Sequence, residues 1–183
     1  MLKNATHGQA VTDPQNAVAL LVIDVQNGLF HKSTPIYKAA ELLRNIDELT
    51  ARAHDVGIPV FFVQHSDRRA LIQGTADWQL HPQLHPAATD PIIHKRHPNA
   101  FAETNLDEAL QARNVKRVVI TGLVTHGCVQ ATCVAAKQLG YRVILVTDAH
   151  SNFNKDAARL IEQWHQTLGD DGIELKGARE VVF

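Results

Sequence analysis

Short runs of almost uninterrupted apolar residues, rich in Val and Ile, recur along the sequence and constrain its fold more than any other feature. Such runs are typical of strands covered on both faces, as in a parallel sheet. Polar or charged residues close most of them. The runs are Ala17–Val25, Ile58–His65, Pro91–Lys95, Arg117–Val124 and Arg142–Thr147.

Segments with the period of an amphipathic helix separate these runs: Ala39–His54, Leu106–Arg113, Cys128–Leu139 and Asp156–Leu168. Gly57 and Gly140 follow two of the segments, as helix stop signals do. Strands that alternate with helices predict an α/β domain with right-handed crossovers. With 183 residues, we expect one domain over 1–183, in which the polar stretch 1–16 is a loosely ordered N-terminal segment.

Charge and apolar content exclude several classes of partner. The formal net charge is −1 and no basic cluster is present, which argues against nucleic acid. The longest apolar run, Ala17–Ile23, is too short to span a bilayer, and Met1–Asn16 lacks the apolar core of a signal peptide. Two cysteines without a CxxC pair suggest neither a disulfide framework nor a structural zinc site. We therefore expect a cytoplasmic protein without a membrane partner.

The connection from Ser66 to Asp90 breaks the alternation, because it has no clear period and contains Gly74, Pro82 and Pro86. A loop of this length in a small domain is usually functional, often as a lid or a pocket wall. The alternative is a surface excursion with a short helix near Trp78. The sequence does not decide between these two interpretations.

Three residue types suited to nucleophilic catalysis follow the predicted strands. Asp24 follows one run, Lys95 ends another, and Cys128 lies just beyond a third, at a predicted helix start. In an open parallel sheet, ligands bind outside the carboxyl ends of the strands, so these side chains should meet there. The helix start and Lys95 would favour a Cys128 thiolate, and Asp24 could accept its proton. This edge of the sheet is therefore the predicted catalytic site.

Three segments carry a resemblance to a known family: LLVIDVQNGLF (Leu20–Phe30), KRHPNAF (Lys95–Phe101) and ITGLVTHGCVQATCVAAKQLGYRVILVTDAH (Ile120–His150). From about Ala17 onward the chain resembles the isochorismatase-like hydrolases. The resemblance implies a three-layer αβα fold around a mostly parallel, six-stranded Rossmann-like sheet. It also implies a catalytic triad of Asp24, Lys95 and Cys128 and assembly into homodimers or homotetramers.

The presence of Cys128 narrows the predicted activity. Family members that hydrolyse the vinyl ether of isochorismate typically lack this cysteine. We therefore expect hydrolysis of a C–N bond in a small amide, ureide or carbamoyl substrate through a thioester, without a cofactor. Vinyl-ether hydrolysis led by Asp24 and a non-catalytic relative with a redox-sensitive Cys128 remain alternatives.

Histidines in and near the long loop raise the question of a metal. The nicotinamidases of this family hold a metal with an Asp-x-His pair and a further His. Here the order is reversed to His65-Ser66-Asp67, with His81 and His85 later in the chain. No ligand motif is met, so we expect no bound metal.

Two further groups of residues are expected around the substrate. A tetrahedral intermediate needs backbone donors, for which the Cys128 N–H and the turn Val124-Thr125-His126-Gly127 are candidates. The resemblance implies a cis peptide between Val124 and Thr125 that directs the Thr125 N–H to the site. Phe30, Trp78 and Phe101 are candidates for the pocket wall, with core packing as the alternative for each.

Overall fold

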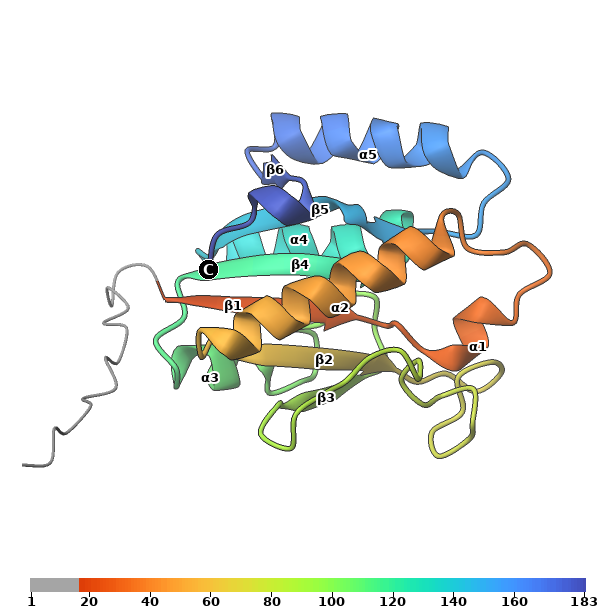
Figure 1. Cartoon of the computed structure of the whole chain (residues 1–183), viewed down its shortest axis with the longest axis horizontal. Helices are drawn as coiled ribbons and strands as arrows, with labels where there is room; N and C mark the ends of the chain where they lie inside the picture. The colour runs from red at the N-terminus through yellow and green to blue at the C-terminus, as the bar shows by residue number, and fades with distance from the viewer. Residues whose placement is uncertain (1–16) are drawn as a thin grey trace, which may run out of the picture.

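Six parallel strands form one sheet in the order β3-β2-β1-β4-β5-β6 in the computed structural model, which describes residues 17–183 (Figure 1). The strands are β1 (Val18–Ile23), β2 (Val60–His65), β3 (Ile92–Lys95), β4 (Arg117–Leu123), β5 (Arg142–Ser151) and β6 (Glu174–Lys176). The helical elements are α1 (Asn27–Phe30), α2 (Ala39–Asp55), α3 (Leu106–Gln111), η1 (Thr125–Val129), α4 (Gln130–Gln138), α5 (Ala157–Asp170) and η2 (Ala178–Glu180). The predicted α/β fold with helices on both faces of the sheet is confirmed.

Both faces of the central strand β1 are covered, which explains its unbroken apolar sequence. Leu20 and Val22 pack in one cluster with Leu42, Ile46 and Leu49 of α2. The alternate residues of β1, which are Ala19, Leu21 and Ile23, belong to a second cluster with residues of α3, α4 and α5. Successive side chains of a strand point to opposite faces, so one apolar run supplies both layers of the core. Figure 1 shows α2 crossing one face of the sheet, with α3 and α4 behind the sheet.

The chain reverses its direction of strand addition between β1 and β4. From β1 the chain adds β2 and then β3 on one side, and it continues with β4, β5 and β6 on the other side. The carboxyl ends of β1 and β4 therefore border the switch point, where open α/β sheets form their ligand crevice. Asp24 directly follows β1, and the turn with Cys128 directly follows β4.

Some predicted boundaries differ from the structure. The sixth strand was not located in the sequence, since β6 is a three-residue edge strand, ELK, with only one apolar residue. Strand β5 continues to Ser151 beyond the predicted end at Thr147. Helix α4 begins at Gln130 and not at Cys128, because Gly127 adopts non-helical backbone angles (φ −128°, ψ −108°) inside η1.

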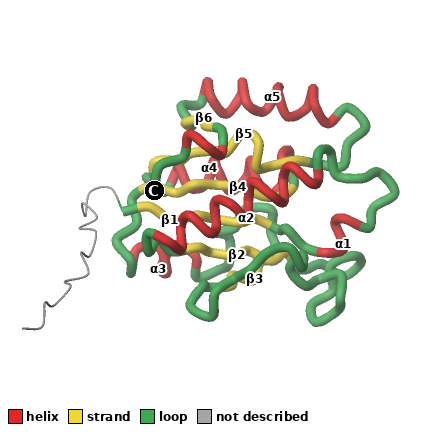
Figure 2. Tube along the Cα trace, in the orientation of Figure 1, coloured by secondary structure: helices red, strands yellow, loops and turns green. Residues whose placement is uncertain are grey.

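The long loop between β2 and β3 contains no helix near Trp78 and lies beside α1 (Figure 2). Two backbone hydrogen bonds join the loop to α1. The Asp77 carbonyl accepts the Gly28 N–H at 2.9 Å, and the Gln79 carbonyl accepts the Asn27 N–H at 3.0 Å. The side chains of Gln26 and Gln64 donate to the Trp78 carbonyl at 2.7 and 3.0 Å. The middle of the loop is therefore fixed against the sheet edge that carries Asp24.

No helix within residues 17–183 has the length and apolar character required to cross a membrane. The expected loose N-terminal segment, 1–16, lies outside the described residues.

Candidate active site

Asp24 is placed by a sharp change of backbone direction at the end of β1. Its φ of 51° is in the left-handed region, which is uncommon for a residue with a side chain but tolerated by Asp. Its N–H still donates to the Val63 carbonyl at 2.9 Å, so the residue remains joined to β2. Only 2% of Asp24 is exposed. The turn thus holds a carboxylate in the interior at the carboxyl edge of the sheet.

Lys95, the last residue of β3, is fully buried and faces Asp24. Its Nζ donates to Asp24 Oδ2 at 2.7 Å, to His65 Nδ1 at 3.2 Å and to the His97 carbonyl at 3.2 Å. An ammonium group has three N–H bonds, so these three acceptors satisfy it completely. A buried charge persists only when it is paired and hydrogen-bonded in this way. Lys95 is therefore a fixed cation in the site.

Cys128 lies in the η1 turn after β4, beside this ion pair. Burial raises the pKa of its thiol to about 12, and the negative charge of Asp24 acts in the same direction while Lys95 opposes both. Cys128 precedes α4 and is largely desolvated, so burial outweighs the effects of the helix start and of Lys95 that would favour a thiolate. The Oδ1 atom of Asp24 is buried and makes no hydrogen bond within residues 17–183. Asp24 thus has a free acceptor for the thiol proton.

His65 also belongs to this cluster, although the sequence suggested it only as a possible metal ligand. It ends β2 in register with Lys95 on β3, so both side chains reach the same edge. Burial and the positive charge of Lys95 lower the pKa of His65, and its neutral ring can accept the Lys95 N–H. The sequence signal for His65 was its position at the end of a predicted strand, Ile58–His65.

The reactive groups open into a cavity of about 230 Å³. It is lined by Asp24, Leu29, Lys32, His65, Asp67, Ala70, Leu71, Leu123, Val124, Cys128 and Phe153. The first part of the β2–β3 loop therefore forms one wall of the cavity. A larger cavity of about 880 Å³ lies at the opposite, amino ends of the strands, beside Val18, Pro91 and Arg117, away from the cluster.

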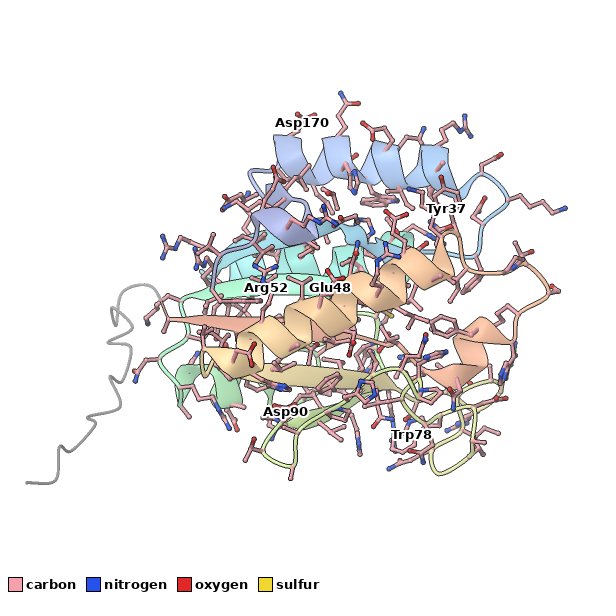
Figure 3. All side chains as sticks on the ribbon, in the orientation of Figure 1. Tyr37, Glu48, Arg52, Trp78, Asp90 and Asp170 are labelled. Atoms are coloured by element: carbon pink, nitrogen blue, oxygen red, sulfur yellow. The ribbon has the colours of Figure 1, made fainter. Side chains whose placement is uncertain are left out.

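The three aromatic residues proposed for the pocket wall are not among the residues that line this cavity. Trp78 is a buried residue of the loop itself, and its Nε1 donates to Ser66 Oγ at 2.9 Å (Figure 3). Phe101 stacks on Tyr141, and Phe30 packs against His81. The apolar walls come instead from Leu29 of α1, Leu71 of the long loop and Phe153, which follows β5.

The suggested metal ligands are not gathered in one place. His85 pairs with Asp47 at 3.0 Å, and the Asp67 carboxylate accepts backbone N–H groups of residues 69, 70 and 71. The group that does converge is Asp24, His65 and Cys128, with potential ligand atoms within 4.8 Å of one another. However, the Lys95 ammonium already contacts the first two, and its charge would repel a metal cation. These residues therefore do not fit a resident metal ion.

The turn before Cys128 contains a cis peptide, one residue earlier than expected. It joins Leu123 and Val124, and the predicted Val124–Thr125 bond is not cis. Leu123 is the last residue of β4, so the cis bond lies where the chain leaves the sheet. Val124 lines the cavity together with Cys128, whereas Thr125 is fully buried.

Comparisons with known proteins identify similar sequences and structures. Residues 18–162 match the family model described as the isochorismatase domain. Streptothricin hydrolase from Streptomyces noursei is 32% identical over 76% of this chain, which spans 51% of that protein. Nicotinamidase 3 from Arabidopsis thaliana is 31% identical over 79% of this chain and 78% of its own length. The crystal structure of an isochorismatase from Pseudomonas putida covers 91% of this chain and 90% of its own, with a TM-score of 0.84 and 26% identity.

Proposed function

Because this chain belongs to the isochorismatase family, we propose that it is a cysteine hydrolase that cleaves a non-peptide C–N bond in a small amide, ureide or carbamoyl substrate. The observation that carries the proposal is that Asp24 and Cys128 line one cavity, while the buried Lys95 pairs with Asp24 at 2.7 Å. The names of two relatives, streptothricin hydrolase and nicotinamidase, support a hydrolytic activity.

In the first half of the reaction, Asp24 accepts the thiol proton as the Cys128 sulfur attacks the substrate carbonyl carbon. The pKa of about 12 means that the thiol is protonated at rest, so the attack requires this base. Lys95 offsets the negative charge on sulfur, in accord with its lowering effect on the Cys128 pKa. Backbone N–H groups of the η1 turn are the candidate donors to the tetrahedral oxyanion.

The intermediate collapses when the protonated Asp24 gives its proton to the leaving nitrogen. The C–N bond breaks, the amine or ammonia departs, and the acyl group remains on Cys128 as a thioester. Asp24, again ionised, then takes a proton from water as the water oxygen attacks the thioester carbonyl. The C–S bond breaks, the departing Cys128 thiolate takes this proton from Asp24, and the carboxylic acid is released.

The cavity supports a small substrate. Its volume of about 230 Å³ lies below the 300–1,000 Å³ typical of pockets for drug-sized ligands. Leucine and phenylalanine side chains form its walls, and Lys32 adds a cation with no ion pair among the salt bridges of the described residues. A compact substrate with an apolar part fits this environment, with or without a carboxylate.

A screen of small amides, ureides and carbamates for released ammonia or amine tests the proposal. The panel should contain neutral compounds and matched compounds with a carboxylate, because of Lys32. We expect turnover of at least one compound and its loss in Cys128→Ala, with an acyl-enzyme mass adduct on Cys128 in the wild type. Turnover that survives in Cys128→Ala would contradict the proposal.

A further inference from the structure

Two histidines that the proposed reaction does not use lie in contact behind the Cys128 turn. His150, on β5, is only 3% exposed, and its Nε2 is 2.8 Å from Nε2 of His165 on α5. On its other side, Nδ1 of His150 is 2.9 Å from the hydroxyl oxygen of Thr125. Thr125 is fully buried and begins the η1 turn. A hydrogen-bonded chain therefore runs from α5 to the turn that carries Cys128.

Thr125 is well placed to control the geometry of this turn. Its carbonyl accepts the N–H of Gln130, where α4 begins. The neighbouring Val124 carbonyl accepts the N–H groups of Gly127 at 3.0 Å and Val129 at 3.3 Å. Cys128 lies between these bonds. A side-chain bond that fixes Thr125 therefore also restricts the position of the Cys128 backbone and sulfur.

The contact between the two imidazoles determines which groups donate and which accept along the hydrogen-bonded chain. Only one hydrogen can lie between the two Nε2 atoms, so one ring donates and the other accepts. The Glu162 carboxylate lies 3.9 Å from His165 Nδ1 and favours a hydrogen there. Neutral His165 then accepts at Nε2 from His150, and His150 accepts at Nδ1 from the Thr125 hydroxyl. All contacting atoms have complementary roles in this arrangement.

A second proton on His165 exchanges the donor and the acceptor in both hydrogen bonds, the one between the two imidazoles and the one between His150 and Thr125. His165 would donate from Nε2, and His150 would have to accept there and carry its hydrogen on Nδ1. His150 would then donate to Thr125, and the Thr125 hydroxyl hydrogen would lose its acceptor. A buried polar hydrogen without an acceptor destabilises the local structure.

The surroundings favour His165 as the site of protonation. Burial, followed by the charge of His165, lowers the pKa of His150 to about 3. Burial also lowers the pKa of His165, but Glu162 on the same helix opposes this effect. On the other side of His150, a cavity of about 200 Å³ is bordered by Lys38, Glu41 and Asp148. Lys38 and Glu41 pair with each other at 3.0 Å, and Asp148 accepts the Ala178 N–H.

We propose that His150 and His165 are positioning residues, whose directional hydrogen-bond chain holds Thr125 and the Cys128 turn and is reversed, with loss of turnover, when His165 is protonated. The effect on turnover rests on the proposed hydrolase function. The tautomeric state of His150 does not depend on it.

The tautomers can be measured by long-range ¹H–¹⁵N NMR on the full chain labelled with ¹⁵N-histidine, titrated downward from pH 8.5. We expect His150 to carry its hydrogen on Nε2 at pH 8.5 and to move it to Nδ1 with the same midpoint as the protonation of His165. An Nδ1–H tautomer at pH 8.5, or a His150 tautomer that is unchanged as His165 titrates, would overturn the proposal. A His165 ring that stays neutral until the chain unfolds would do the same.

Variants of Thr125 and His165 test the link to catalysis. Thr125→Val removes the hydroxyl at similar volume and should lower kcat by roughly tenfold with little change in KM, whereas Thr125→Ser should retain most of kcat. His165→Gln should remove the acid-side loss of kcat that His165 causes in the wild type. Equal kcat values for Thr125→Val and the wild type, together with an unchanged pH profile for His165→Gln, would refute the catalytic part. The absence of any hydrolysed amide would instead refute the proposed function and leave the tautomer result standing.

Discussion

Asp24 raises the pKa of the Cys128 thiol and Lys95 lowers it. Asp24 also has a second effect on Cys128, which can be separated from the first. As a base, it is needed to remove the thiol proton. As a negative charge, it contributes to the raised pKa of Cys128, after the larger effect of burial. These two effects predict that turnover and intrinsic thiol reactivity respond differently to the same substitution.

We expect Asp24→Asn to reduce turnover by about 10²- to 10⁴-fold, the usual contribution of general acid–base catalysis. The same substitution should accelerate alkylation of Cys128 by iodoacetamide, because removal of the negative charge lowers the thiol pKa and raises the thiolate fraction. Peptide mass mapping measures the labelling, with the fully buried Cys133 as the internal control. Slower alkylation of Asp24→Asn than of the wild type would show that the charge effect is misassigned.

The Lys95 ammonium leads to a prediction about metal ions. It lies 2.7 Å from Asp24 Oδ2 and 3.2 Å from His65 Nδ1, two of the atoms that could otherwise bind a cation. Protein purified without added metal should contain well under one equivalent of zinc, iron or manganese by elemental analysis. Lys95→Met should bind zinc more tightly than the wild type and lose at least about a hundredfold in turnover.

Full metal occupancy in the wild type would contradict the argument from Lys95. His85→Gln is a suitable control variant, because His85 is exposed, pairs with Asp47 and lies outside the cavity. Its zinc affinity should equal that of the wild type.

At the level of elements, the contact between β1 and β4 sets the position of Asp24. A Cβ atom on Gly122 would lie 2.0 Å from the Ile23 carbonyl oxygen and 2.6 Å from the Ile23 nitrogen. The φ of Gly122, 113°, is also unfavourable for any residue with a side chain. Ile23 directly precedes Asp24, so a shift of β1 at this point would move the carboxylate.

Gly122→Ala should therefore reduce both stability and turnover. The overlap exceeds a small adjustment, and we expect a loss of at least about 1–3 kcal/mol in the free energy of unfolding. Gly140→Ala is the matched control, since Gly140 has a φ of 91° but a Cβ atom there would meet no other atom within 4 Å. Thermal melts followed by circular dichroism, together with turnover, provide the comparison. Equal losses in the two variants would mean that backbone conformation alone, and not the contact with Ile23, limits position 122.

The elements that the sequence predicted well are those with strong periodic patterns. The β1 sequence is an unbroken apolar run, the β4 sequence is mostly apolar, and α2 has an apolar stripe, so their positions followed from local composition. The polar edge strand β6 has no such pattern. The start of α4 depends on the backbone of Gly127, which local composition does not determine.

The same distinction applies to the site. Asp24, Lys95 and Cys128 could be selected because strand ends are recognisable and converge on one edge. The cavity walls could not, because Leu71 and Phe153 come from irregular segments whose paths depend on tertiary contacts. The contact of His65 with Lys95 depends on strand register, which also requires the folded sheet.

For the whole molecule, the buried His150 should make stability depend on pH. Its pKa is lowered from 6.5 to about 3 by burial and by the charge of His165. Above pH 6.5 the ring is neutral in both the folded and the unfolded chain. Below that value the unfolded chain binds a proton that the folded chain excludes, so stability falls as the pH falls from 6.5 towards 3.

At pH 5 this linkage should reduce the free energy of unfolding by about 2 kcal/mol relative to pH 8, equivalent to about 4–8 °C in Tm for a chain of this size. His150→Asn keeps an acceptor for the Thr125 hydroxyl but cannot titrate, so its Tm should be lower at pH 8 yet fall less between pH 8 and pH 5. His126→Gln, which changes an exposed histidine two residues from Cys128, should retain the wild-type slope. Thermal melts at matched ionic strength measure all three proteins. A slope for His150→Asn as steep as that of the wild type would assign the acid sensitivity to other groups, of which His65 and His165 are the next candidates because burial lowers the pKa of both.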